Sequence, residues 1–529
     1  MNMASMGYFP VPQELLHDCI RKTLEKVPVN ISFEQLLPEQ IRCIENVVNG
    51  KDTFLMLPTG SGKTLPFQIV SSVVKELRQH DKAYQQHFPS QPIVIVVSPL
   101  LSLMRSHVRE MHILGISSAS LNSPEDERIK LGHFEVVLGS PESWLNSTTW
   151  REVLLTPEFQ QRIICLVTDE VHCVPKWGLQ GRKKAEAVFW ETFGRLGELR
   201  TLLPEGTPIL AMTATATKKS RRMIYNSLCL RSPEELVSSP DRKNVKLSIR
   251  KIPTVAIIDG EKVKLEPSEQ FDHVFKPLVE DIVTKKLGSD LTIIYCRTVK
   301  ECGEVYEYFS RELGSEGYSF EGAARISANR LFAMFHHSTP DEIKNDVLKS
   351  LIDDGHYRLI IATNALGMGI NARHVRRVFN VGIPEDIEAY IQEIGRAGRD
   401  GQRSHAILFY KSFHLLQADE TMKSYARNTS ICRRALLMKQ FQALKRLNLI
   451  MTVVIYVRQS ASAVSVKQRA ELTVLLYRMS HKRSHLLYSS VWLRPRMRNC
   501  SDVPYLNTEI VYSDAVQITI LWDQDSPPS

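Results

Sequence analysis

The sequence predicts an α/β fold with parallel sheets, because its apolar residues come in short continuous runs separated by longer segments of mixed polarity. Strands that are buried on both faces have this continuous pattern, and intervening segments long enough for a helix are typical of parallel connections. The runs between residues 53 and 381 read TFLML, IVIVV, FEVVL, ICLV, ILAM, TIIY, RLIIA and RVFNV.

The length of the chain indicates more than one domain, because 529 residues exceed what a single hydrophobic core usually organises. The segment between residues 250 and 292 is charged and has few long apolar runs, so we place a boundary near residues 239–244. The expected parts are a helical lead at 1–30, sheet domains at 31–240 and 241–412, a short helical segment at 413–443 and an irregular tail at 444–529.

The overall charge of +9 favours a polyanionic partner, because clustered Lys and Arg release counterions from phosphate backbones. A basic protein without such a partner is the alternative. The nine cysteines form no CxxC pair, and the opening residues MNMASMGYFPVPQELL lack a basic region followed by an apolar core. We therefore expect an intracellular, reducing compartment. No uncharged apolar run approaches the ~20 residues of a membrane-spanning helix, so no membrane partner is expected.

A glycine-rich turn follows the first apolar run and predicts a phosphate-binding loop. Gly60 and Gly62 tolerate the backbone conformation that points N–H groups toward a β-phosphate. Lys63 would reach the β- and γ-phosphate oxygens, and the Thr64 hydroxyl would bind Mg²⁺. Leu57 replaces the first Gly of the strict motif, and a turn that binds nothing is the alternative. The predicted nucleotide-contacting residues are Pro58, Thr59, Gly60, Ser61, Gly62, Lys63 and Thr64.

Two adjacent carboxylates follow the apolar run ICLV. An acid at the end of a strand beside the phosphate loop is placed to hold Mg²⁺, and this predicts that role for Asp169. Glu170 would then polarise the attacking water as a general base. The alternative is that both acids only stabilise the start of the next helix.

Eight stretches, taken in order, resemble the motifs of the RecQ-like ATP-dependent DNA helicases, which belong to superfamily 2 and carry a DEAH or DEVH box. They are LLPEQ (36–40), LPTGSGKT (57–64), SPLLSLM (98–104), LNS (121–123), DEVHCVPKWG (169–178), AMTATAT (211–217), IIYCRT (293–298) and ATNALGMGINARHVRRVFNVGIPEDIEAYIQEIGRAGRDG (362–401). The resemblance implies two tandem RecA-like domains, an ATP-binding domain and a helicase C-terminal domain, with ATP and Mg²⁺ held between them. It also implies 3′ to 5′ unwinding of duplex DNA in repair or recombination.

The resemblance assigns further residues to the nucleotide site. Gln40 would read adenine, and Gly367 and Asn371 would complete the site from the second domain. Facing the γ-phosphate, the resemblance places the catalytic residues Gln392, Arg396 and Arg399 beside Lys63, Asp169 and Glu170. Thr213 and Thr215 would couple the two domains.

The resemblance also implies a track for single-stranded and forked duplex DNA, with contacts mainly to phosphates. The assigned residues are Ser98, Ser102, Arg105, Trp177, Arg297, His336 and Thr363. Three of these residues have alternative roles that involve no DNA. Arg105 could be a solvated helix residue, His336 a core histidine and Trp177 a core tryptophan. We expect a nuclear protein if the source is eukaryotic and a cytoplasmic one otherwise; protein partners are unknown.

Three departures from the family pattern limit which of the family's residue roles can be assigned to this chain. Leu37 stands where the family has an Arg, which affects adenine stacking. The loop after Trp177 reads LQGRKKAEAVFWE and lacks the family's His-Asp-Phe-Arg-Pro run, so coupling between DNA and ATP is expected to differ. Residues 314–330 are longer than is usual and predict a surface insertion.

The resemblance stops after residue 443. The helices at 413–443 and Cys432 correspond to part of the family's zinc subdomain, yet the next Cys is Cys500, so no zinc site is expected. A shifted reading frame of LIMTVVIYV (449–457) can encode His-Asp-Cys-Cys-Asp-Ile-Cys, which resembles the missing cluster. We interpret residues 444–529 as a frame-shifted, poorly ordered tail, with a divergent domain as the alternative.

Other functions stay open at this point. A DNA-stimulated ATPase could translocate without separating strands, because no winged-helix domain is recognisable in the sequence. A DNA-binding remnant without catalysis is disfavoured, because Lys63, Glu170 and Arg399 are all present. The family-specific motifs disfavour an RNA helicase.

Overall fold

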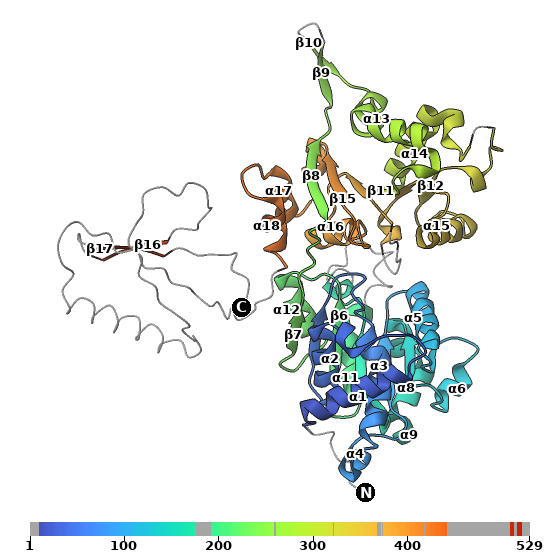
Figure 1. Cartoon of the computed structure of the whole chain (residues 1–529), viewed down its shortest axis with the longest axis vertical. Coiled ribbons are helices and arrows are strands. Elements are labelled where there is room, and N and C mark those ends of the chain that lie inside the picture. The colour runs from blue at the N-terminus through green and yellow to red at the C-terminus, as the bar shows by residue number, and fades with distance from the viewer. Residues whose placement is uncertain are drawn as a thin grey trace. The chain divides into compact units, whose positions relative to one another are not determined.

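The computed structural model describes residues 10–175, 192–258, 261–320, 322–367, 372, 374–416, 418–441, 508–512 and 516–520. Two large sheets, one of seven strands and one of six, organise the chain up to residue 441 (Figure 1). Every strand pair in both sheets is parallel. The predicted α/β fold class with two parallel sheets is therefore confirmed.

The first sheet has the strand order β3-β4-β2-β5-β6-β1-β7. Its strands are β1 (Thr53–Met56), β2 (Ile93–Val97), β3 (Ser118–Ser120), β4 (Val136–Gly139), β5 (Ile163–Thr168), β6 (Ile209–Thr213) and β7 (Glu234–Val237). The central strands β1, β2, β4, β5 and β6 are buried along their whole length, because helices cover both faces. This is why their sequences read as continuous apolar runs.

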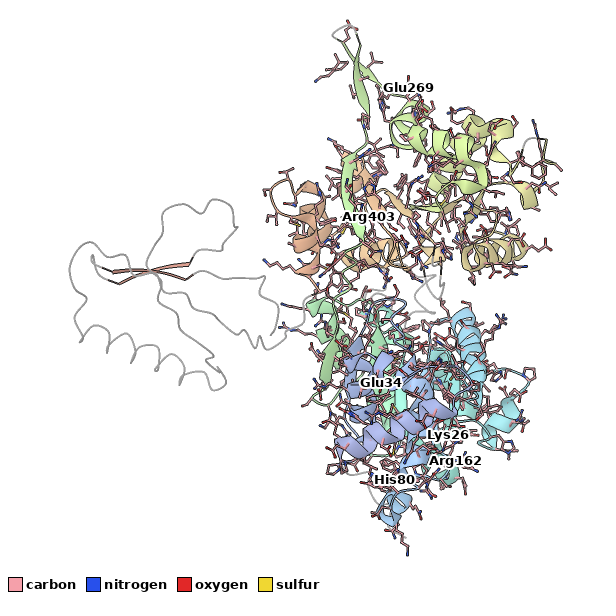
Figure 2. The ribbon with its side chains drawn as sticks, in the orientation of Figure 1. Lys26, Glu34, His80, Arg162, Glu269 and Arg403 are labelled. Atoms are coloured by element: carbon pink, nitrogen blue, oxygen red, sulfur yellow. The ribbon has the colours of Figure 1, made fainter. Side chains whose placement is uncertain are left out.

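The helices of this part are α1 (Gln13–Lys26), α2 (Pro38–Val48), α3 (Leu65–Leu77), α4 (Lys82–His87), α5 (Leu101–Ile113), α6 (Asp126–Lys130), α7 (Pro141–Asn146), α8 (Thr148–Leu155), α9 (Pro157–Gln160), α11 (Leu199–Leu202) and α12 (Lys218–Ser227), with 3-10 turns η1 (Phe33–Gln35) and η3 (Leu196–Glu198). Helix α1 buries Leu16 and Ile20 in the same core as α3. Lys26, labelled in Figure 2, forms an ion pair with Glu76 of α3. The N-terminal helix is thus part of the first core.

The second sheet has the order β12-β13-β11-β14-β15-β8. Its strands are β8 (Val245–Lys251), β11 (Thr292–Cys296), β12 (Phe332–Phe335), β13 (Leu359–Ala362), β14 (Arg377–Val381) and β15 (Ser404–Tyr410). Strands β8, β12 and β15 lie outside the predicted runs. β8 is a sheet edge with exposed Lys246 and Arg250, so only part of its sequence is apolar.

The helices of the second part are α13 (Pro267–Lys285), α14 (Val299–Leu313), α15 (Asp341–Asp353), α16 (Ile387–Ile394), α17 (Glu420–Arg427) and α18 (Arg433–Met438), with 3-10 turns η4 (Lys286–Gly288), η5 (Gly314–Gly317), η6 (Ser327–Asn329), η7 (Asn364–Leu366) and η8 (Ser412–Leu416). A two-stranded hairpin, β9 (Val255–Ile258) and β10 (Glu261–Lys264), follows β8 and projects from this part in Figure 1. Residues 314–330 include an isolated bridge between Tyr318 and Arg330.

Beyond residue 441 the structure describes one antiparallel pair, β16 (Thr508–Tyr512) and β17 (Val516–Ile520), which belongs to a unit separate from the rest of the chain. The rest of the interpreted tail lies outside the described residues. Across the part of the chain that is described, no helix is both long enough and apolar enough to cross a membrane.

Candidate active site

The phosphate loop connects the end of β1 to the start of α3. Gly60 has φ +83° and Gly62 has φ +74°, a left-handed conformation that favours glycine. A Cβ atom on Gly62 would lie 2.8 Å from Gln40 Nε2, so a side chain at this position would displace the Gln40 amide. The Ser61 N–H donates to the Pro58 carbonyl at 3.2 Å and the Leu65 N–H donates to the Gly62 carbonyl at 3.1 Å. The loop is therefore held in a turn that suits a phosphate.

Gln40 is buried against this loop. Its Nε2 donates to the carbonyl oxygens of Gly62 at 2.7 Å and Ser61 at 3.3 Å, while its Oε1 accepts from the Leu37 N–H at 2.7 Å. The amide thus supports the phosphate loop in this conformation. Its predicted role in reading adenine stays a prediction.

Lys63 lies between the two predicted carboxylates. Its Nζ is 2.9 Å from Glu170 Oε1 and 3.3 Å from Asp169 Oδ1. Strand β5 ends at Thr168 and is parallel to β2 and β6. The two acids that follow it therefore lie at the C-terminal ends of the strands, as the phosphate loop does. The structure therefore brings together the three residues that sequence reasoning placed at the centre of catalysis.

Burial and charge act in opposite directions on this group. Burial alone would lower the pKa of Lys63, but the charges of Asp169 and Glu170 outweigh it and raise that pKa. Burial likewise opposes ionisation of Glu170, while Lys63 and His172 lower its pKa below the usual range. Burial also opposes ionisation of Asp169, but Lys63 and His107 lower its pKa, so all three side chains are charged at neutral pH. Glu170 also has φ +50°, a strained backbone conformation that is common at functional sites.

A chain of polar contacts runs from Glu170 to the second sheet domain. His172 Nδ1 lies 3.1 Å from both Glu170 Oε2 and Thr213 Oγ1. Thr213 Oγ1 donates to the Thr215 carbonyl at 3.1 Å, and Gln392 Nε2 on α16 donates to Thr215 Oγ1 at 2.9 Å. The site at the phosphate loop is thus connected to α16 through side chains and the Thr215 backbone carbonyl. Sequence reasoning did not assign His172, although it lies within the DEVHC motif.

The arginine loop, residues 395–399, lies against the phosphate loop. Thr59 Oγ1 donates to the Gly395 carbonyl at 3.4 Å. Arg396 is buried and its guanidinium donates to the Gly367 carbonyl. Burial, with the positive charges of Arg396 and Arg242, lowers the pKa of Arg399 to about 9, so Arg399 stays charged at neutral pH.

Arg242 is a further residue that sequence reasoning missed. It belongs to the segment between the two sheets, and its guanidinium donates to the Thr59 carbonyl at 2.6 Å. A single Arg in a linker gives no signal in the sequence, since only the fold brings it to a loop 183 positions away. Arg242 therefore adds a further positive charge beside the phosphate loop.

The residues of the predicted DNA track differ in exposure. Ser102 and Arg105 are exposed on α5, whereas Ser98, at the end of β2, is fully buried. In the second sheet domain, Arg297, His336 and Thr363 follow β11, β12 and β13 at the same end of the sheet. Arg297 also lines a cavity of about 280 Å³ together with His172 and Gln392. The DNA-binding roles of these residues stay predictions.

Some predicted residues lie outside the described part of the chain. These are Trp177 with the loop that follows it, and Asn371. Cys432 is exposed and immediately precedes α18, and the sequence between it and Cys500 lies mostly outside the described residues. In the ranges that the structure describes, no three His, Cys, Asp or Glu side chains gather as a metal-binding cluster.

The donor set at the phosphate loop fits ATP with Mg²⁺. Asp169 supplies a buried carboxylate and Thr64 supplies a hydroxyl at the start of α3, and oxygen donors of this kind suit Mg²⁺. Lys63 supplies an ammonium group, and the loop glycines leave the backbone open to a phosphate. Mg²⁺ usually keeps phosphate and water oxygens as further ligands, so one carboxylate and one hydroxyl are sufficient.

Comparison with known proteins agrees with this geometry. The family described as DEAD/DEAH box helicase matches residues 37–224, and the helicase conserved C-terminal domain matches residues 275–401. The ATP-dependent DNA helicase hus2/rqh1 of Schizosaccharomyces pombe is 28% identical over 70% of this chain and 24% of its own length. The ATP-dependent DNA helicase RecQ of Pasteurella multocida is 28% identical over 78% of this chain and 54% of its own length.

Solved structures show the same fold. The helicase Lhr of Mycobacterium smegmatis aligns with a TM-score of 0.52 and 20% identity over 78% of this chain and 49% of its own. Dbp5 of S. cerevisiae aligns with a TM-score of 0.52 and 18% identity over 80% of this chain and 94% of its own. These two likenesses concern the RecA-like fold alone.

The chain spans between 24% and 62% of the length of the curated relatives it matches. Its two helicase domains carry the phosphate loop, the paired acids and the arginine loop in the order that the sequence predicts. The chain therefore contains a DEAD/DEAH box helicase domain and a helicase conserved C-terminal domain, and its relatives include RecQ-type ATP-dependent DNA helicases.

Proposed function

We propose that the chain is an ATP-dependent 3′ to 5′ DNA helicase that hydrolyses ATP at the phosphate loop. The observation that carries the proposal is the path of polar contacts from Lys63 through Glu170, His172 and the threonines to Gln392. A nucleotide-dependent motor needs a connection of this kind, because hydrolysis at one domain has to change the position of the other.

Lys63 and Glu170 are proposed to exchange partners during the reaction. In this conformation Lys63 holds Glu170 at 2.9 Å. Once Lys63 turns toward phosphate oxygens, the Glu170 carboxylate is free to take a proton from water, a role worth ~10² to 10⁴ in rate. Asp169 and Thr64 would hold Mg²⁺, which when bound neutralises charge on the phosphate oxygens.

The arginine loop is proposed to complete the site from the second sheet domain. Arg399, and with it Arg396, would place positive charge opposite the γ-phosphate; an arginine in this position is worth ~10³ to 10⁵ in rate. Gln392 and Thr59 join the two domains at the same place. Turnover is therefore expected only when the domains are together, which couples hydrolysis to movement along DNA.

The proposed DNA substrates are single strands and forked duplexes, contacted mainly through phosphates by Ser102, Arg105, Arg297 and His336. Repair or recombination is the proposed setting, by the resemblance of the motifs to the RecQ-like family, and the nucleus is the proposed location if the source is eukaryotic. Movement is proposed to run 3′ to 5′. A partial duplex with a 3′ overhang should be unwound, and one with a 5′ overhang should not.

A forked-duplex assay run beside an ATPase assay tests the proposal. Strand release together with ATP hydrolysis is the expected result. Hydrolysis stimulated by DNA without strand release would instead establish a translocase that does not separate strands. DNA binding without hydrolysis would establish a non-enzymatic DNA-binding protein.

A further inference from the structure

A buried histidine on α5 contacts the carboxylate that is proposed to hold Mg²⁺. His107 is 3% exposed, and its Nε2 lies 3.1 Å from Asp169 Oδ2. Its ring packs nearly perpendicular to the ring of Phe67 on α3, with 5.7 Å between ring centroids. The imidazole is therefore held in one orientation, with a ring nitrogen directed at Asp169.

The two oxygens of Asp169 have different partners. Oδ1 accepts the Glu170 N–H at 2.9 Å and faces Lys63 at 3.3 Å. Among the described contacts, Oδ2 is contacted by His107. An imidazole nitrogen that faces a carboxylate donates its N–H, so His107 Nε2–H fixes the rotation of the Asp169 carboxylate.

The opposite side of the ring connects to the phosphate-loop helix. His107 Nδ1 lies 3.8 Å from Glu110 Oε2, and the same oxygen accepts from Gln68 Nε2 at 3.3 Å. The Gln68 N–H donates to the carbonyl of Thr64 at 3.2 Å. Helix α5 is thus linked through His107 to Asp169, and through Glu110 to Gln68 in the first turn of α3, the helix that begins after Thr64.

Helix α5 also presents the proposed DNA contacts on its outer face. Ser102 and Arg105 are exposed, whereas His107 is on the buried face of the same helix. A packed helix moves as a rigid element, so a shift of α5 under DNA would displace His107 by a similar amount. The hydrogen bond from His107 to Asp169 weakens steeply when its angle changes. A displaced His107 would therefore hold the Asp169 carboxylate in a different orientation, or release it.

We propose that His107 is a positioning residue that orients Asp169 for Mg²⁺ and transmits the position of the DNA-contacting helix to that carboxylate. The inference rests on the proposed function, because it needs both the nucleotide site and the DNA track. It assigns to α5 a regulatory role beyond DNA contact. The alternative is a core histidine whose contact with Asp169 affects folding only.

The test compares His107→Gln with His107→Met in the full chain. The two replacement side chains are similar in size, but only Gln carries an amide N–H that can donate to Asp169. The control is His112→Met, because His112 is exposed on the same helix. Two quantities are measured for each variant: the Mg²⁺ concentration needed for tight binding of fluorescent ADP, and the ratio of ATP turnover with and without single-stranded DNA.

His107→Met is expected to need about 10- to 100-fold more Mg²⁺, the usual effect of losing a partner behind a metal ligand. Its stimulation by DNA should fall, whereas His107→Gln and His112→Met should stay within a few fold of the wild type. Equal Mg²⁺ dependence in the Met and Gln variants would overturn the positioning role. A changed Mg²⁺ dependence with unchanged stimulation by DNA would overturn the transmission.

If His107→Met does not fold, His107→Asn provides the same test, because its amide is too short to reach Asp169 Oδ2. The wild-type protein separates failure of this inference from failure of the proposed function. A wild type without Mg²⁺-dependent ATP hydrolysis would contradict the proposed function. An active wild type with unaffected His107 variants would contradict only the role of His107.

Discussion

Glu388 of α16 accepts two hydrogen bonds from the start of α12. Its Oε1 lies 2.7 Å from the backbone N of Thr217 and 2.5 Å from the Ser220 hydroxyl. Thr217 is the residue before α12, where unpaired N–H groups give the helix a partial positive charge. The contact therefore joins α16, the helix before the arginine loop, to Thr217, which follows the threonines Thr213 and Thr215.

Removing this carboxylate is expected to slow ATP hydrolysis. Glu388 is buried, and a hydrogen bond to a charged group contributes about 1.5–3 kcal/mol. If the closed arrangement loses about 1.5–3 kcal/mol, kcat of Glu388→Ala should fall by about 10- to 150-fold. Steady-state turnover at saturating ATP measures this. The control is Glu342→Ala, because Glu342 is an exposed acid on α15. An unchanged kcat in a folded Glu388→Ala protein would show that the contact of Glu388 with α12 does not support turnover.

The assigned roles of Lys63 and Glu170 predict different effects on binding. Both Lys63→Ala and Glu170→Gln should abolish turnover, Glu170→Gln by about 10² to 10⁴ through loss of the base. Only Lys63→Ala should greatly weaken nucleotide binding, because Lys63 is the residue expected to contact phosphate. Titration with fluorescent ADP distinguishes the two variants. An equal loss of binding in both would show that these roles are wrongly assigned.

Arg399→Ala should leave ATP binding nearly intact and lower kcat by about 10³ to 10⁵, because its charge is expected to act mainly in the transition state. Arg403, which is exposed and labelled in Figure 2, gives a matched control in Arg403→Ala. Binding and turnover are measured on the same preparations. A normal kcat in Arg399→Ala would show that the Arg399 charge does not stabilise the transition state.

Binding of DNA should weaken steeply with salt. A phosphate track releases counterions, so a log–log plot of affinity against salt should have a slope of several units. Arg105→Ala should reduce that slope by about one, and Arg311→Ala, an exposed charge on α14, should not. Fluorescence anisotropy with a labelled single strand measures both. A flat salt response would mean that phosphates do not form the track.

The interpretation of residues 444–529 as a frame-shifted tail makes a prediction about the transcript. Sequencing should show that the shifted frame across residues 449–457 encodes a cluster of cysteines. The purified chain should then hold no stoichiometric zinc by elemental analysis. A transcript whose shifted codons do not encode that cluster would favour a divergent domain.

The sequence could predict the buried strands and the chemistry at their ends. Continuous apolar runs mark strands such as β2 and β5, and a turn with two glycines before Lys63 has a direct physical meaning. Edge strand β8 could not be predicted in the same way, because its exposed charges interrupt the apolar pattern. The predictions were therefore strongest where both faces of a strand are covered.

The supporting residues of the site needed the fold. His107 is on the buried face of α5 and looks like a core residue in the sequence, yet it contacts Asp169, 62 positions away. Arg242 reaches Thr59 across 183 positions. Parallel strands connect through crossover helices, so neighbours at one sheet edge come from distant segments. The local pattern of the sequence contains no information on which distant segments lie side by side in the fold.

The rate of ATP hydrolysis with and without single-stranded DNA tests the central claim most directly. The wild-type chain with Mg²⁺ should hydrolyse ATP slowly alone and many times faster with DNA, and Glu170→Gln should be inactive in both conditions. RNA of the same length should stimulate less. Hydrolysis that is absent, or that survives in Glu170→Gln, or that does not respond to DNA, would contradict the account of a DNA-dependent motor.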